Sequence, residues 1–523
     1  MKKFTILTLI AAICFAAFSF SGCFIFKSEK KNYVKVSNLS ELKAAKEDIL
    51  LTQDIDCDFA SVSEIVCKSV DGQGHTLKNA VLNDCSFFIT SEILNINFEN
   101  ITCRAVSSSN ISIVAAAEMD SSDHLKVGSI SMENVTVKNS TIDMPQSNLK
   151  TLYAGIFVDG DPSWHSGSCV NVSFKNCYAK NVIMRVGADG ISSIDGTKKW
   201  GKVYFGGLIG NARYVNVEHC GIEDCEFFTY GRVDQAIYGG GLVGCFDELR
   251  DNKNSIKDSF VKNTYITACA PNASVWAGIA VTNTADVYLG GLAGQYATSG
   301  SIVQSFSSEN NIAATCSGKA TVGGLVGHFT GSAVSSSYSF DNYIYGGYCE
   351  VGNKSHVVGG LFAVAKNCTV SSCFTFDNKI LTDDNDCISI SEGSNGEHYL
   401  SDTTYSVIAG FIASASSVSA TYCAATNTLR DSIHYLEGNI HIGVWGLEEY
   451  GLYIDDILDE FWFGGTAVNC YVTQPVESGN SQNLPTITED IWRTPSAIKS
   501  KLNLMGEKWV FENGKAPYLS LTD

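Results

Sequence analysis

The chain has 523 residues, of which 45% are hydrophobic and 17% charged, with 47 glycines and only 7 prolines. This balance is typical of many short strands and turns, and it argues against long salt-bridged helices and against a proline-rich stalk. The formal net charge of −19 argues against nucleic acid or an anionic lipid surface as a partner.

The N-terminus has the pattern of an export signal. Two lysines precede an apolar run over residues 4–18, which is too short for a membrane span, and Phe20-Ser-Gly-Cys23 follows. Small residues directly before a cysteine resemble the bacterial lipobox, although Phe20 stands where that motif usually has leucine. The resemblance implies that residues 1–22 are a lipoprotein signal peptide and that Cys23 becomes the lipidated N-terminus. Ordinary secretion with cleavage nearby is the alternative.

Removal of residues 1–22 would make the exported chain more acidic. Two lysines are lost, so 34 basic residues face 55 acidic ones and the formal charge becomes −21. Attachment to the membrane would then depend on acyl chains on Cys23 and not on basic patches. Residues 23–32 are a short polar tether, and we expect the folded part to begin at residue 33.

From residue 33 the sequence predicts a strand, a short helix and a second strand. Asn38-Leu-Ser-Glu41 has the spacing of a capping box, and residues 48–52 resume extended structure. A helix at this place would protect the open end of a stacked sheet from edge pairing. We therefore expect a small helical N-terminal cap.

Paired small residues before a large apolar residue recur through the interior, at Gly206, Gly240, Gly290, Gly323, Gly359 and Ala409. Each unit continues with a Ser or Cys, usually an aromatic residue, and then an Asn or Asp. We expect the glycine pair at the start of a strand where backbones approach closely, and the Asn or Asp in a left-handed turn. Three short extended segments fit each unit, and none has helical periodicity.

These units predict a stacked solenoid. Three strands in about 33 residues cannot bury their own apolar faces, whereas parallel stacking gives them a continuous core. A β-propeller, the main alternative, needs four strands and about 40 to 50 residues per blade. We therefore predict an all-β solenoid of about ten coils over residues 33–480, clearest over 150–430, with residues 481–523 as a helix and hairpin that cap its C-terminal end.

The repeat resembles a known family. Gly323-Gly-Leu-Val-Gly327, followed by Ser337-Tyr338, is similar to the GLUG repeat of bacterial surface and adhesin-like proteins, and the resemblance covers roughly residues 50–430. It implies a right-handed parallel β-helix and a lipoprotein on the cell envelope or surface. It also implies a non-catalytic adhesion or interaction module, which binds glycan or protein and acts as a monomer.

Insertions concentrate in one connection of the repeat, between the Asn or Asp turn and the next glycine pair. In a stacked array this connection lies along one side, which is often the binding face. The long insertions carry Trp200, Trp276 and Tyr399, which we predict as candidate contacts to sugar rings. The alternative is that these aromatic residues fold back onto the solenoid.

The seventeen cysteines beyond Cys23 do not follow a disulfide pattern. Cys177 and Cys220 occupy the repeat position that Ser259 and Ser305 fill elsewhere. A position that accepts either residue indicates a small buried slot, so we predict mostly free, stacked thiols.

No motif of an enzyme, a metal site or a cofactor site is present. The acidic run Asp383-Asp-Asn-Asp386 has the composition of a solvated loop, and His75, His219 and His328 are isolated in the sequence. Parallel β-helices also carry polysaccharide lyases and hydrolases, so a carbohydrate-active enzyme is the alternative function, on the analogy of fold alone.

Overall fold

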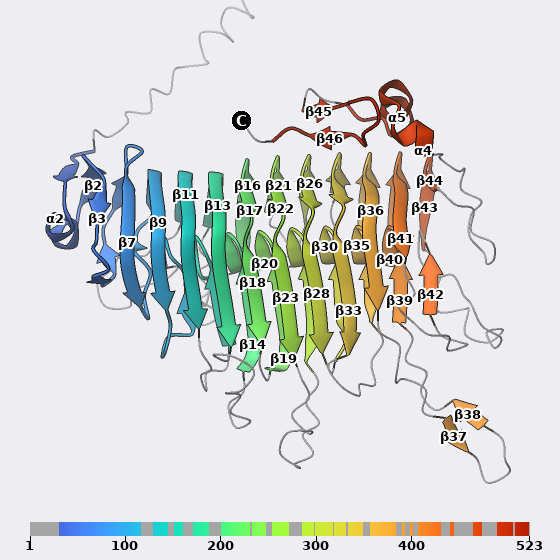
Figure 1. Ribbon diagram of the computed structural model, residues 1–523, viewed down its shortest axis with the longest axis horizontal. Helices are drawn as coiled ribbons and strands as arrows, with labels where there is room; N and C mark the ends of the chain where they lie inside the picture. Colours follow the sequence, from blue (N-terminus) through green and yellow to red (C-terminus); the bar gives the residue numbers. More distant parts are fainter. Residues whose placement is uncertain are drawn as a thin grey trace, which may run out of the picture.

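Strands stack side by side along one long axis (Figure 1). The computed structural model describes residues 31–116, 129–144, 151–160, 171–187, 200–230, 233–246, 254–270, 285–297, 299–316, 318–330, 333–348, 356–382, 390–392, 398–400, 406–429, 440–443, 464–472, 489–505 and 508–521.

Each coil pairs in parallel with the coil before it and the coil after it. The pairing places one buried apolar residue of every coil in a single column, which the following residues form: Ile49, Val70, Ile93, Met132, Phe174, Val217, Ile256, Ile302, Val334, Val370 and Ala420. Such columns merge into one core cluster that runs through the stack. The prediction of an all-β, parallel, solenoid-like fold is confirmed.

A nine-stranded sheet forms one side of the stack. Its strands, in order, are β10 (Asn110–Ile111), β12 (Thr151–Gly155), β14 (Trp200–Gly206), β19 (Val233–Gly240), β24 (Asp286–Gly290), β29 (Ala320–Gly323), β34 (Val357–Gly359), β39 (Ser406–Ala409) and β42 (Ile440–Gly443).

A second, larger sheet forms the rest of each coil and bends at two corners. Its first coils contain β1 (Val34–Val36), β2 (Asp48–Leu51), β3 (Ile55–Asp56), β4 (Ser61–Val62), β6 (Ser69–Asp71), β7 (Thr76–Asn83), β9 (Glu92–Arg104), β11 (Ser129–Met144) and β13 (Asn171–Gly187). The short pair β5 (Ile65–Val66) and β8 (Phe88–Ile89) lies beside them.

In the later coils the same path is divided into shorter strands. Those that follow the glycine pair are β15 (Ile209–Ala212), β20 (Val243–Phe246), β25 (Ala293–Tyr296), β30 (Val326–Thr330), β35 (Phe362–Ser371) and β40 (Ile412–Thr421). Those before the first corner are β16 (Tyr214–Glu218), β21 (Asn254–Lys257), β26 (Gly300–Val303), β31 (Ala333–Ser335) and β43 (Gly464–Val468).

The remaining strands of each coil lie beyond the first corner. Between the two corners lie β17 (Gly221–Glu223), β22 (Phe260–Lys262), β27 (Phe306–Ser308), β32 (Tyr338–Phe340), β36 (Phe374–Thr382), β41 (Ala424–Leu429) and β44 (Tyr471–Val472). Beyond the second corner lie β18 (Glu226–Tyr230), β23 (Tyr265–Ala270), β28 (Asn311–Cys316) and β33 (Tyr343–Tyr348), and β36 continues into this position.

Both corners are made by residues with left-handed backbone. At the second corner φ lies between +46° and +58°, and it is occupied by the predicted Asn or Asp at Asn181, Asp224, Asn263, Asp341 and Asp377, and by Glu309 in one coil. At the first corner φ lies between +48° and +53°, at Asn176, His219, Asp258, Gln304, Ser336 and Ser372. Asn and Asp tolerate this conformation best, which confirms the predicted role of the repeated Asn or Asp.

The glycine pair ends a strand and does not begin one, so the predicted strand start is wrong. Gly240, Gly290 and Gly323 are the last residues of β19, β24 and β29. A Cβ on Gly323 would lie 1.9 Å from the carbonyl oxygen of Val326, because the chain turns sharply at this point. The predicted close approach of backbones is therefore confirmed, and it explains why glycine occupies this position in most coils.

The residue after the first corner fills a small buried slot. Ser259 and Ser305 donate their hydroxyls to the carbonyl oxygen two residues earlier, at 2.8 and 2.9 Å. Cys220 and Cys373 donate their thiols in the same way, at 3.3 and 3.2 Å. The slot therefore accepts either donor, and the prediction of free, buried thiols is confirmed at these cysteines and at Cys177.

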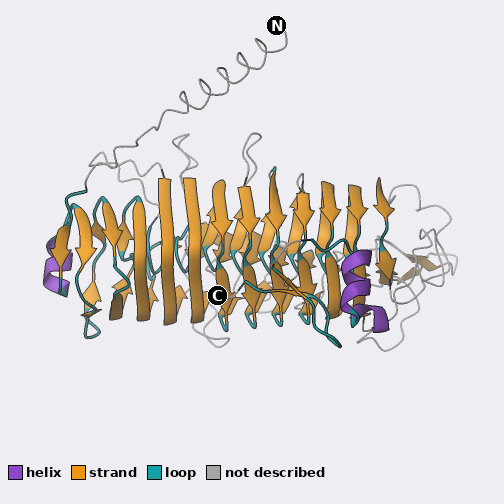
Figure 2. Ribbon diagram, turned by 90° about the horizontal axis from the view of Figure 1, so that it is seen from above, coloured by secondary structure: helices purple, strands orange, loops and turns teal. Residues whose placement is uncertain are grey.

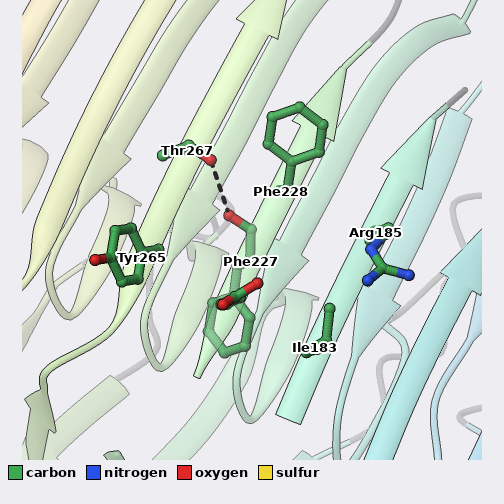
Figure 3. Close-up of a pocket in the computed structure, with 7 residues that line it drawn as sticks. Ile183, Arg185, Phe227, Phe228, Tyr265 and Thr267 are labelled. Atoms are coloured by element: carbon green, nitrogen blue, oxygen red, sulfur yellow. Dashed lines mark hydrogen bonds between the residues drawn. The ribbon is translucent and has the colours of Figure 1, made fainter. Parts of the chain in front are cut away.

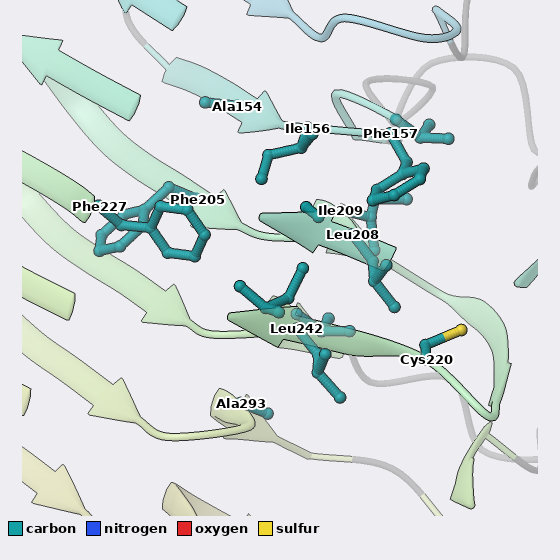
Figure 4. Close-up of a cluster of buried hydrophobic side chains, with 14 of the residues drawn as sticks. Ala154, Ile156, Phe157, Phe205, Leu208, Ile209, Cys220, Phe227, Leu242 and Ala293 are labelled. Atoms are coloured by element: carbon teal, nitrogen blue, oxygen red, sulfur yellow. The ribbon is translucent and has the colours of Figure 1, made fainter. Parts of the chain in front are cut away.

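Large side chains fill the space between the two sheets. Figure 4 shows Phe157, Phe205, Leu208, Phe227 and Leu242, from successive coils, among the side chains of this core. Since each of these side chains is buried, the body of the solenoid is a packed core and not a channel.

Helix α2 (Leu39–Ala44) lies at the N-terminal end of the stack (Figure 1). The predicted capping box is present, since Asn38 Oδ1 accepts a hydrogen bond from the Glu41 amide at 3.0 Å. The Glu41 carboxylate in turn accepts one from the Ser37 amide at 2.7 Å.

The C-terminal segment lies along the side of the stack, whereas the sequence predicted a cap across its end (Figures 1 and 2). We call its described residues, 489–505 and 508–521, the C-terminal strap. The expected helix and hairpin are present, as α4 (Glu489–Trp492), α5 (Pro495–Lys501), β45 (Trp509–Val510) and β46 (Tyr518–Leu519).

The strap packs along the side of the stack against a row of aromatic side chains, which the stacking of the coils creates. Trp492, Trp509 and Leu519 pack against rings of several successive coils, which include Tyr338 and Phe374. Burying these apolar side chains together stabilises the strap along the side.

Candidate functional site

The side chains predicted as ligand contacts fall outside the part of the chain whose side chains the structure describes. Trp200 begins β14 and pairs with Val233, and Tyr399 lies in β38 (His398–Leu400), which pairs antiparallel with β37 (Ile390–Glu392). Their side chains, together with Trp276 and Cys23, lie outside the described part of the structure.

The predicted side for the insertions follows from the topology. The long insertions join β13 to β14, β23 to β24 and β36 to β39. Their starting strands stack on one another, and so do the strands to which they return. All these connections therefore leave and re-enter the solenoid along one edge, as the sequence predicted.

The stack of strands from which these insertions leave carries exposed aromatic side chains on its outward face. Phe228 is 40% exposed, Tyr265 51% and Tyr343 39%, although rings of this size are usually covered in a folded domain. We call the outward side chains of β13, β18, β23, β28 and β33 the outer aromatic face. An apolar patch of this kind is a common mark of an interaction site.

A first shallow cavity of about 280 Å³ lies on this face, between β13, β18 and β23 (Figure 3). Phe228 and Tyr265 form part of its wall, and Arg185 and Glu226 bring charge to it. The Arg185 guanidinium lies 3.3 Å from the Asp143 carboxylate, so its charge is partly balanced within the protein.

A second cavity of about 180 Å³ adjoins the first and shares Tyr265 with it. Tyr265 pairs in register with Asn311, and Asn311 pairs in register with Tyr343. The two tyrosines therefore flank Asn311, which lies on the coil between them. The Asn311 Oδ1 atom is buried and has no hydrogen-bond partner, which is costly for an amide oxygen.

Carboxylates of the second corner border the second cavity. Glu309 and Asp341 line it, and the Glu309 carboxylate lies 3.4 Å from the Lys262 ammonium. The Asn263 amide donates to Asp224 at 2.7 Å and lowers the pKa of that carboxyl, so Asp224 carries its charge at neutral pH. The border of the face is thus rich in hydrogen-bond acceptors.

The aromatic residues of this face were missed in the sequence, although a signal was present. Tyr265 and Tyr343 each stand two residues after the second corner, at Asn263 and Asp341. Side chains alternate along a strand, so the second residue after a corner residue points outward. Once the corner is known, the exposed position follows from this count.

A cluster of possible metal ligands lies elsewhere, at the first corner. Glu218, His219 and Asp258 place ligand atoms within 4.8 Å of one another. However, the Lys508 ammonium from the strap lies 2.9 Å from Asp258 Oδ2 and 3.0 Å from His219 Nε2. The Lys508 ammonium therefore occupies the position that a metal ion would take. We infer that this cluster holds the strap against the solenoid.

The histidines named from the sequence lie in different surroundings in the structure. His219 belongs to the strap cluster, where its contacts with Lys508 and Asp258 are structural. His75 lies 3.3 Å from Asp54, and burial lowers the pKa of His328 to about 4. The run at residues 383–386 lies outside the described residues.

No family model and no curated protein matches this chain. Within the described residues, no helix is long and apolar enough to cross a membrane.

Proposed function

We propose that this protein is an envelope-anchored lipoprotein that acts as an adhesion module and binds a glycan through the outer aromatic face. In this proposal the solenoid is a right-handed parallel β-helix with small caps at its ends, and lipid on Cys23 holds it to the membrane. One chain supplies the whole face, so a monomer suffices and no cofactor is required.

The exposure of Phe228, Tyr265 and Tyr343 beside two shallow cavities carries this proposal. Aromatic rings offer large, rigid apolar surfaces, and the polar groups around them can orient a hydroxyl-rich ligand. A surface protein is the other class of ligand that such a patch can bind. The many acceptors at the border favour a glycan, because sugar hydroxyls donate hydrogen bonds.

The insertions support the same face. Those that carry Trp200 and Trp276 begin at the ends of β13 and β23, whose outward side chains form part of it. The one that carries Tyr399 begins at β36, which pairs with β33 of the face. Residues from these loops would extend a binding surface that the rigid strands begin. The three aromatic residues thus remain candidate contacts.

Binding is tested with the protein from residue 24 onward on an array of glycans and on bacterial and host surface proteins. We expect binding to a set of glycans, no turnover, and loss of binding in Tyr265→Ala and Tyr343→Ala. The matched control is Phe59→Ala, because Phe59 is 61% exposed near the N-terminal end of the solenoid. Release of unsaturated or new reducing-end products from a polysaccharide panel would instead establish the carbohydrate-active enzyme.

Anchorage is tested separately. Cys23→Ala, expressed in a bacterium with a lipoprotein pathway, is expected to leave the membrane fraction and to lose incorporation of labelled fatty acid. A variant that stays membrane-bound would refute lipidation at Cys23 without affecting the proposed binding face.

A further inference from the structure

Three residues that line the second cavity of the outer aromatic face come from the same position of successive coils. Tyr265, Asn311 and Tyr343 occupy the same register position in three successive coils. Neighbouring strands are about 4.8 Å apart, so the two tyrosines are separated by about 9.6 Å along the long axis. This separation is comparable to the length of a disaccharide unit in an extended chain.

The middle of this row has an unmet hydrogen-bond acceptor. Asn311 lies in register between the two tyrosines, and its Oδ1 is buried and has no partner. Buried polar atoms of this kind normally bond to a protein group, a water or a ligand. A donor hydroxyl or N–H group from a ligand that enters between the rings would satisfy it.

The charges around the cavity select against acidic ligands. Glu309 and Asp341 line its border, and Lys379 is the one cationic residue among its lining residues. The chain as a whole is strongly acidic. A ligand rich in carboxylates or sulfates would meet repulsion here, whereas hydroxyl and amino groups would find acceptors.

The two cavities adjoin at Tyr265. Tyr265 belongs to the walls of both cavities. Phe228 lies in β18, which pairs with the strand of Tyr265 on the side toward the N-terminus. A ligand that fills the second cavity and continues across Tyr265 therefore runs from coil to coil, across the strands.

We propose that the outer aromatic face binds a linear glycan without acidic sugars, which lies along the axis of the solenoid. One sugar ring occupies the second cavity between Tyr265 and Tyr343 and donates a hydrogen bond to Asn311. The chain then continues over Tyr265 toward Phe228. This inference rests on the proposed function and names the ligand class of the same face.

The test is calorimetric titration of the protein from residue 24 onward with matched-length series of linear oligosaccharides, from one to six sugars. The series are neutral β-1,4-glucan, chitosan and oligogalacturonate. We expect binding of a neutral or amino-sugar series to strengthen with length until both cavities are spanned, and oligogalacturonate to bind least. A single sugar that binds as tightly as the chain, or oligogalacturonate that binds best, would overturn the inference.

Two substitutions test whether a sugar ring of the ligand lies beside Asn311. Asn311→Leu keeps the size of the side chain but removes the acceptor, and we expect it to weaken binding about tenfold, the effect of one lost hydrogen bond to a ligand. Asn216→Leu, on the outward face of β16, is the matched control and should change nothing. Unchanged binding in Asn311→Leu would overturn the inference, provided that circular dichroism shows the variant is folded.

The outcomes separate this inference from the proposed function. If every linear series fails while array glycans bind and Tyr265→Ala abolishes that binding, the inference falls and the proposed function stands. If Tyr265→Ala and Tyr343→Ala leave array binding intact, both fall.

Discussion

Two of the surfaces of this solenoid that carry aromatic rings differ in whether they are covered. On the first, Phe260, Phe306, Tyr338 and Phe374 stack from coil to coil, with ring centroids 4.9 to 5.4 Å apart. All four are buried beneath the strap or by one another. On the second, the outer aromatic face, the rings of Phe228, Tyr265 and Tyr343 stand exposed.

The difference agrees with the separate roles that we propose for the two surfaces. Parallel stacking in register places equivalent residues above one another, so a repeat with an aromatic position produces a row wherever it points. The chain covers one row with Trp492 and Trp509 of the strap, as expected for apolar surface that contributes to stability. No described residue covers the other row, as expected for surface that binds a ligand.

The largest expected effect is on the covered row. Trp492 is fully buried against Phe374 and Phe376, so Trp492→Ala should lower the free energy of unfolding by about 3 to 5 kcal/mol. Denaturant titration measures this. Met505→Ala is the control, because Met505 is 66% exposed in the same strap and should cost less than about 0.5 kcal/mol. Equal effects of the two variants would contradict a packed strap.

Acid should act on both surfaces together, because the responsive groups lie in the solenoid that supports them. Burial lowers the pKa of His356 to about 4, and its Nδ1 accepts a hydrogen bond from the Ala320 amide at 3.1 Å. Below pH 6.5 the unfolded chain takes up a proton that the folded chain refuses, so stability falls as pH falls. At pH 4 this loss is about 3 kcal/mol.

The measurement is the free energy of unfolding between pH 7 and pH 4. His356→Gln cannot titrate, so its stability should change less over this range than that of the unaltered protein. If the free energy of unfolding fell equally with pH in the two proteins, His356 would not be a cause of the acid sensitivity.

The polar fastening of the strap gives a smaller effect. Asp258 is 3% exposed, and Lys508 is its nearest ion-pair partner, so Lys508→Met should cost about 1 to 3 kcal/mol. Hydrogen exchange should rise in the strap and stay unchanged on the outer aromatic face. Lys515→Met, which removes an exposed pair with Glu512, should leave exchange unchanged, because such surface pairs contribute little.

The Tyr338 hydroxyl of the covered row allows the contribution of one hydrogen bond to be measured separately from that of apolar packing. The Leu519 amide donates to the Tyr338 hydroxyl at 3.3 Å across the interface with the strap. Tyr338→Phe keeps the stacked ring and should cost about 1 kcal/mol. A cost as large as that of Trp492→Ala would mean that hydrogen bonding, and not apolar packing, holds the strap.

Much of the fold could be predicted because it depends on local backbone chemistry. Gly323 marks a place where no Cβ fits, and Asn263 and Asp341 mark a left-handed corner. The first corner escaped prediction because His219, Asp258, Gln304 and Ser336 share a conformation but no chemical type. Residue type alone does not reveal it; the residue that follows, Ser or Cys, does.

The parts that could not be predicted depend on which surfaces meet. Whether the C-terminal helix and hairpin would close the end of the stack or lie beside it is decided by the row around Tyr338, which exists only after stacking. The candidate site has the same origin. Tyr265, Asn311 and Tyr343 are separated by 46 and 32 residues in the chain and become neighbours through parallel register.

We propose that the outer aromatic face binds a ligand and that the covered row stabilises the fold. The most direct measurement is the affinity of the double variant Tyr265→Ala/Tyr343→Ala for a glycan selected on the array, together with its thermal unfolding. We predict that binding is lost while unfolding is nearly unchanged, since both side chains are exposed. Retained binding, or unfolding as impaired as in Trp492→Ala, would contradict the claim.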